Sequence, residues 1–164
     1  MRKLLLFAAS VAFTMGALLV SCAAQAGGHG GGISANATSG AYTLTLKVLP
    51  AESFAGPHSA MAWDGGAKPD LLSAKPAPNH HLVVFVKKNG KPVEKGNVSI
   101  RYRMLKPSTG PWHHLPVARM HVAGKSLATT HYGNNVMLTP GRYAVWVKVD
   151  DAPAHVFRFA LKGG

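Results

Sequence analysis

The chain is poor in cysteine and in acid. Cys22 is its only cysteine, and a chain cut after residue 26 has none, so it can form neither a disulfide nor a thiolate metal site. The six acidic residues are too few and too scattered for a convincing general acid/base pair. There is no Ser/His/Asp set in a nucleophile elbow and no phosphate-binding glycine loop before a helix. These absences remove most enzyme classes, and we predict a protein that is not an enzyme.

The first residues have the pattern of an export signal. "MRK" is a basic start, and residues 4–20 form an apolar run, so we predict a signal peptide over residues 1–26. Two processing signals follow the run. "AQA", residues 24–26, is a small-x-small cleavage site, whereas "LVSC", residues 19–22, is a lipobox that would acylate Cys22. In both cases we expect a periplasmic protein, either released or held on a membrane by a lipid anchor.

The chain carries a formal charge of +12, and removal of Arg2 and Lys3 leaves 12 − 2 = +10. A basic balance of this size favours a polyanion partner. The lysines and arginines are scattered, however, with no dense basic run and no nucleic-acid motif. We therefore predict no nucleic-acid binding, and we favour a solvated basic surface over a specific polyanion site.

The pattern after the signal peptide indicates one all-β domain. Residues 27–40 are rich in glycine and small polar residues, which predicts a flexible leader before a domain over residues 41–164. "YTLTLKVL" alternates as a half-buried strand does, and Asn89-Gly90 after "HHLVVFVKK" indicates a hairpin. Residues 50–78 predict a long connection with a short helix only around residues 58–63.

Later strands are predicted in "NVSIRYRML", "HHLPVARMHV", "GRYAVWVKV" and "HVFRFAL". Tyr143, at the start of one of them, is a candidate tyrosine corner. Seven or so short strands with regular turns predict an antiparallel β-sandwich of immunoglobulin-like or cupredoxin-like type.

Histidine and methionine remain as the candidate functional residues, because both can bind a metal ion. The chain has nine histidines, and four of its six methionines, Met61, Met104, Met120 and Met137, follow the signal peptide. Imidazole together with thioether sulfur, in the absence of thiolate, favours copper. Because neighbouring residues of a strand point to opposite faces, only one of His80 and His81 can face a given site.

Other candidates are weaker. We expect His113 and His114 to be a solvated pair, and Met104 and Met137 to fill the core. Met120 lies near the end of a strand, where a ligand is better placed.

Three segments carry a resemblance to a known family. "TTHYGNNVMLTPGRYAVWV" resembles the His-Tyr-Gly-x-Asn-Val segment and the following Pro-Gly-x-Tyr strand of periplasmic iron-uptake-associated proteins, which accompany ferrous-iron permeases. "NHHLVVFV" is similar to that family's His-Leu strand, and "VARMHV" occupies the place of its methionine-bearing strand. The resemblance covers roughly residues 41–155 and implies an immunoglobulin-like sandwich that forms a homodimer and binds copper near the dimer interface.

The resemblance also implies a ligand set. His81 matches the histidine of the His-Leu strand, His131 that of His-Tyr-Gly, and Met120 the methionine. His155 is the nearest match to a late histidine, which in the family comes from the same or the partner subunit. Val83 stands where the family has an acidic residue, which disfavours a harder ion such as iron or manganese and leaves copper.

These observations favour an exported copper-binding protein, with iron as a second candidate metal, that assists periplasmic iron or copper acquisition beside an inner-membrane iron permease. The alternative is a structural or partner-binding immunoglobulin-like envelope module without a metal site. We expect His131, held by a turn before a rigid strand, to meet His81 and Met120 across the sandwich. Copper affinity should fall as the pH drops through the free-histidine range near ~6.5.

Overall fold

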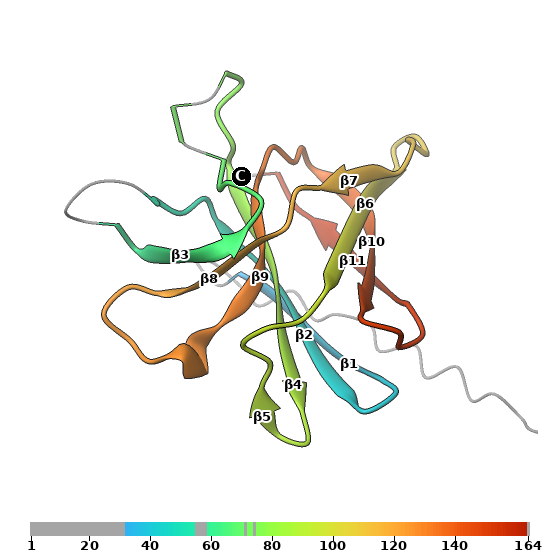
Figure 1. Cartoon of the computed structure of the whole chain (residues 1–164). Helices are drawn as coiled ribbons and strands as arrows, with labels where there is room; N and C mark the ends of the chain where they lie inside the picture. Colours follow the sequence, from blue (N-terminus) through green and yellow to red (C-terminus); the bar gives the residue numbers. More distant parts are fainter. Residues whose placement is uncertain (1–31, 55–58, 71, 74, 164) are drawn as a thin grey trace, which may run out of the picture.

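The computed structural model describes residues 32–54, 59–70, 72–73 and 75–163, and these form two antiparallel sheets (Figure 1). The first sheet runs in the order β1 (Ile33–Ser39), β2 (Tyr42–Pro50), β4 (His80–Lys88), β9 (His131–Val136), β8 (Ala118–Val122) and β3 (Met61–Gly66), with β5 (Lys91–Pro92) beside β4. The second sheet runs β11 (His155–Leu161), β10 (Gly141–Val149), β6 (Val98–Lys106) and β7 (His113–Leu115). One 3-10 turn, η1 (Leu127–Thr129), precedes β9. The prediction of an all-β antiparallel sandwich is confirmed.

The core lies between the two sheets. Alternate residues of β4, such as Leu82 and Val84, face alternate residues of β10, such as Val145 and Val147, and all four are fully buried. Because successive side chains of a strand point to opposite faces, each strand buries one set of side chains in this core and turns the other set to the outer face of its sheet. The free face of β4 carries His81, Val83 and Phe85.

Two local features agree with the sequence. Asn89 and Gly90 have φ angles of 53° and 79°, as the two central residues of a type I′ hairpin turn require. The hydroxyl of Tyr143 donates to the carbonyl of Thr139 at 2.8 Å, which is the contact expected of a tyrosine corner.

The predicted leader is wrong from residue 33 onward. Residues 33–39 form β1, which pairs along its whole length with β2, so the sandwich begins at Ile33 rather than at residue 41. Small residues conceal the alternation in "ISANATS", because Ala35 supplies little apolar surface although it is buried. The predicted signal peptide and residues 27–31 lie outside the described residues.

The short helix expected near residues 58–63 is also wrong. Residues 61–66 form β3, which is held in the extended conformation by its pairing with β8. Tertiary pairing of this kind overrides a weak local signal. Met104 packs against the core as expected, whereas Met137 is 42% exposed and is not core filler. Within the described residues, no helix is long and apolar enough to cross a membrane.

Candidate metal centre

The outer face of the first sheet, turned away from the second sheet, brings together three of the four predicted ligands. β4, β9 and β8 are neighbours in this sheet, and they carry His81, His131 and Met120 respectively. His81 lies opposite Asn135, and Met120 lies opposite His131 in the strand register. Side chains directly opposite one another on antiparallel strands have Cβ atoms roughly 5 Å apart. Met120 and His131 are therefore neighbours on one face of this sheet, and the His81 ring reaches the His131 ring on the same face, with centroids 5.6 Å apart. The expected meeting across the sandwich is wrong, because all three residues lie in one sheet.

The local structure of His131 agrees with the expectation of a turn followed by a strand. His131 is the first residue of β9, a strand whose six residues are all buried. The turn that precedes it is η1, and the carbonyl of Thr129 in this turn accepts the hydrogen bond of the His131 ring.

The two imidazole rings lie close together and perpendicular. Their centroids are 5.6 Å apart and their planes meet at 89°. His81 is 0% exposed and His131 is 1% exposed. With metal–nitrogen bonds of ~2.0 Å, each ring centroid lies roughly 3 Å from the metal, so two rings on one ion have centroids about 5 to 6 Å apart. The observed separation of the rings fits a shared ion.

One nitrogen of each ring is fixed by a hydrogen bond. His131 Nδ1 lies 2.9 Å from the Thr129 carbonyl, which can only accept, so this nitrogen carries the proton. His81 Nδ1 lies 3.0 Å from Asn135 Oδ1, and the amide nitrogen of Asn135 donates to two carbonyls, so His81 Nδ1 is also the donor. In both rings the lone pair is therefore left on Nε2.

Both Nε2 atoms are buried and have no hydrogen-bond partner among the described residues. A buried acceptor without a partner costs free energy, about 1–3 kcal/mol each, unless it has another ligand. Metal-binding histidines use the same arrangement, in which one ring nitrogen donates to the protein and the other binds the ion. The two orphaned lone pairs fit a metal better than they fit an apolar core.

Burial keeps both rings neutral. Desolvation, followed by the neighbouring His131, lowers the pKa of His81 to about 4, against the opposing hydrogen bond of Asn135. Desolvation also lowers the pKa of His131, while the Thr129 carbonyl opposes that change. Neutral imidazole is the form that can bind a metal, and both rings are in this form near neutral pH.

Met120 contributes sulfur to an otherwise apolar surrounding. It is fully buried and packs with Val83 and Ala118, and Phe54 and Phe85 lie against this cluster. Phe54 covers His81 with ring centroids 5.5 Å apart, and Phe85 covers His131 at 5.1 Å. Val83 thus lies in an apolar patch beside the histidines, which agrees with the expectation that this position supplies no oxygen ligand for a hard ion.

Gly133 allows β9 to approach β4 closely between the two histidines. A Cβ atom at this position would lie 2.1 Å from the carbonyl oxygen of Leu82 and 2.8 Å from Val83. No side chain fits there, so the glycine of "HYGNNV" is required by the packing of the two strands.

Sequence reasoning missed the role of the two asparagines that follow. Asn135 donates to the carbonyls of Glu52 and Asp70 at 2.8 and 3.0 Å and accepts from the Glu52 amide at 3.1 Å. It thereby joins His81 to the two connections that flank β3. Phe54, two residues after Glu52, is held over His81 by the same connection.

Asn134 fixes the second of these connections. Its side chain accepts from the Asp70 amide at 2.7 Å and donates to the carbonyls of Lys68 and Pro116. Asparagine is uncommon inside strands, so two in succession between a histidine and a valine are the signal that could have indicated a buried polar network.

His155 is not brought to the other three residues within one chain. It lies on β11, the edge strand of the second sheet, opposite Val147, and its ring packs against Phe157. Its expected contribution from a partner subunit stays a prediction.

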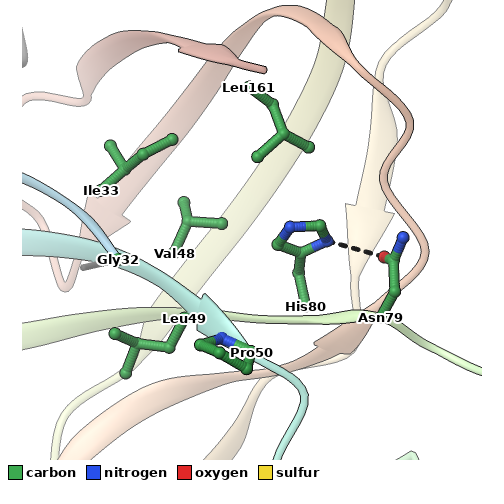
Figure 2. Close-up of a pocket in the computed structure, with 8 residues that line it drawn as sticks. All are labelled: Gly32, Ile33, Val48, Leu49, Pro50, Asn79, His80 and Leu161. Atoms are coloured by element: carbon green, nitrogen blue, oxygen red, sulfur yellow. Dashed lines mark hydrogen bonds between the residues drawn. The ribbon is translucent and has the colours of Figure 1, made fainter. Parts of the chain in front are cut away.

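The remaining histidines have other surroundings. His113 and His114 are exposed, as expected, and His121 lies 2.7 Å from the carboxylate of Asp64. His80 faces away from His81, which confirms that only one of the two can serve the site. Figure 2 shows His80 beside Asn79 at the mouth of a pocket of about 290 Å³, with Ile33, Val48 and Leu161 on its apolar wall.

The described residues hold no group of three or more His, Cys, Asp or Glu side chains that could bind an ion. The candidate set is instead two imidazoles and one thioether, which is a soft donor set. No family model, curated protein or solved structure matches this chain.

Proposed function

We propose that this protein is an exported, non-catalytic copper-binding protein, whose metal is held by His81, His131 and Met120. The observation that carries the proposal is the pair of buried Nε2 lone pairs on two rings whose centroids are 5.6 Å apart. Bound copper would supply a soft, redox-active cation, and the protein would supply two preformed neutral imidazoles and a thioether. Periplasmic location and assistance to iron or copper acquisition beside an inner-membrane permease complete the proposal, supported by the signal-peptide pattern and the family resemblance.

The donor set favours copper over iron. The face that carries the histidines is lined by Val83, Phe54 and Phe85, which have no oxygen ligand to offer a hard ion. Two imidazoles and a thioether in an apolar, enclosed setting favour Cu(I) in particular.

The alternative is a partner-binding module whose histidines lie on its surface without a metal. Exposed His113 and His114 fit that description, but fully buried His81 and His131 do not. Burial of two imidazoles with unpaired nitrogens costs stability, and this cost is unexplained in a module that binds no metal.

The test is competition titration of Cu(I) and calorimetry of Cu(II) with the purified protein. We expect one equivalent of copper to bind, and His81→Ala together with His131→Ala to abolish binding. The matched control is the double variant His113→Ala and His114→Ala, which removes the same number of imidazoles and should bind as the parent does. Equal binding by the two double variants would refute the proposed site.

A further inference from the structure

The outer face of the second sheet gathers positive charge that is dispersed along the sequence. Arg101 and Arg103 lie on β6, Arg142 on β10 and Arg158 on β11, and we call these four residues the arginine face. These three strands are neighbours in the second sheet (Figure 1). They point away from the core because the residues that alternate with them are buried between the sheets. These alternating residues include Ile100, Tyr143, Val145, Phe157 and Phe159.

Two of the arginines are stacked on tryptophan rings. The guanidinium carbon of Arg101 lies 5.2 Å from the ring centroid of Trp146, and that of Arg103 lies 4.6 Å from Trp112. Stacking restrains a guanidinium plane and leaves its N–H edges free to bind a carboxylate or phosphate in a bidentate manner. The Nε atom of Arg103 is buried, so the terminal nitrogens of this guanidinium are the donors that a partner can reach. The face thus holds preoriented donors.

No acidic side chain neutralises this face. The only ion pair among the described residues joins His121 to Asp64 in the first sheet. The acidic residues lie on β3 or in connections between strands, at Glu52, Asp64, Asp70, Glu94, Asp150 and Asp151. Unpaired arginines on a flat sheet create a positive field that attracts an acidic partner.

The choice of arginine over lysine on this face also bears on what it binds. Arg119 is the one arginine of the described residues that lies outside this face. The face also carries the exposed Lys106 and Lys148, whereas exposed lysines such as Lys87, Lys91 and Lys125 lie at the first sheet and its connections. Lysine suffices for a solvated basic surface, but planar recognition of carboxylates favours arginine. Arginine and tryptophan are also the residues enriched where protein interfaces concentrate their binding energy.

We propose that the arginine face docks an acidic protein partner through aspartate or glutamate carboxylates, independently of the copper site. A membrane surface is less suited to it, because interfacial binding is strengthened by apolar side chains that enter the lipid, and the alternating apolar residues of these strands are buried in the core. Trp146 is half-buried beneath Arg101, and Trp112, at 39% exposure, is stacked with Arg103. The stacked rings are engaged with the arginines and orient them.

The test measures anisotropy of a fluorescein-labelled oligoglutamate peptide, which represents the carboxylates of the partner, mixed with the purified protein at low salt. We expect the quadruple variant R101Q/R103Q/R142Q/R158Q to bind about tenfold more weakly than the parent. The matched control K87Q/K91Q/K95Q/K125Q removes the same charge from exposed positions and should change affinity by less than about twofold. The double variant R101K/R103K retains its charge but loses the planar donors, and we expect about threefold weaker binding.

Equal losses in the two quadruple variants would overturn the proposal, because they would show attraction to net charge alone. Binding to phosphatidylglycerol vesicles without binding to the peptide would also overturn it, in favour of a membrane. An unchanged circular dichroism melting curve for each variant ensures that a lost signal reports the face and not the fold.

Discussion

His81 and His131 project from neighbouring strands of one sheet so that their rings meet at 89° with centroids 5.6 Å apart. Each ring has its Nδ1 proton committed to a protein oxygen and its Nε2 lone pair free in a dry setting. The relationship depends on Gly133 between the strands, on Asn135 behind His81 and on Met120 beside His131.

Gly133→Ala should destabilise the protein by more than about 3 kcal/mol, because the added methyl group meets backbone atoms that cannot rotate away. The clash is with the Leu82 carbonyl oxygen at 2.1 Å. Gly110→Ala is the matched control, since nothing lies within 4 Å of a Cβ atom there. Urea unfolding of both variants measures the difference. A tolerated Gly133→Ala would mean that the strands can separate without cost.

Met120→Leu separates a ligand from core filler. The substitution nearly preserves volume, so the free energy of unfolding should change by less than about 1.5 kcal/mol. If the sulfur binds the ion, Cu(I) affinity should fall by at least about tenfold while Cu(II) affinity, dominated by imidazole, falls less. Competition titration in both oxidation states gives the comparison. An unaltered Cu(I) affinity would assign Met120 to packing alone.

Asn135→Ala should weaken copper binding by about 10- to 100-fold although Asn135 does not touch the ion. It removes the acceptor that keeps the proton on His81 Nδ1 and releases the connection that carries Phe54. Asn36→Ala, which removes an exposed amide from β1 of the same sheet, is the control and should bind copper normally. Because Asn135→Ala also destabilises the fold, affinity should be measured well below its melting temperature.

Stability should fall as the pH drops from ~6.5 toward 4. The pKa of folded His81 is lowered to about 4, so the unfolded chain binds a proton in this window that the folded chain does not. The loss from this residue alone approaches about 3 kcal/mol at pH 4, and His131 acts in the same direction. Urea titrations at several pH values measure the slope, which should be shallower in His81→Leu. His113→Ala, at an exposed position, should keep the parent slope.

The same pKa values revise the expected pH dependence of copper binding. A loss of affinity near ~6.5 would apply to exposed histidines. In the folded protein, proton competition for His81 begins only as the pH approaches about 4, and the pKa of His131 is lowered as well, so the loss of affinity should begin below the free-histidine range. Titration of the metal-free protein with copper at several pH values in this range measures the affinity. A steep loss above pH 6 would indicate exposed, protonated ligands and contradict the buried site.

Several features of the fold follow from local sequence. Alternation predicted the strands β2, β10 and β11, and an apolar run predicted β4. Asn89-Gly90 predicted its hairpin because both positions need positive φ. Tyr143 was a candidate tyrosine corner, and the structure shows its hydroxyl bonded to Thr139. β1 and β3 were not predictable in this way. Their residues are small, polar or irregular, and only pairing with β2 and β8 makes them extended.

The sequence by itself determined which side chains can act as donors: nine histidines and six methionines, with one cysteine and six acids, a composition that favours soft metals. It also indicated that His80 and His81, as neighbours on a strand, must face opposite sides of the sheet. Only the tertiary structure decided that His81, His131 and Met120 share one outer face, since strand order places β9 between β4 and β8, which are distant in sequence. The same holds for the arginine face, where the register of β6, β10 and β11 gathers side chains that look scattered along the chain. Residue type is a local property, whereas proximity depends on pairings between strands far apart in sequence.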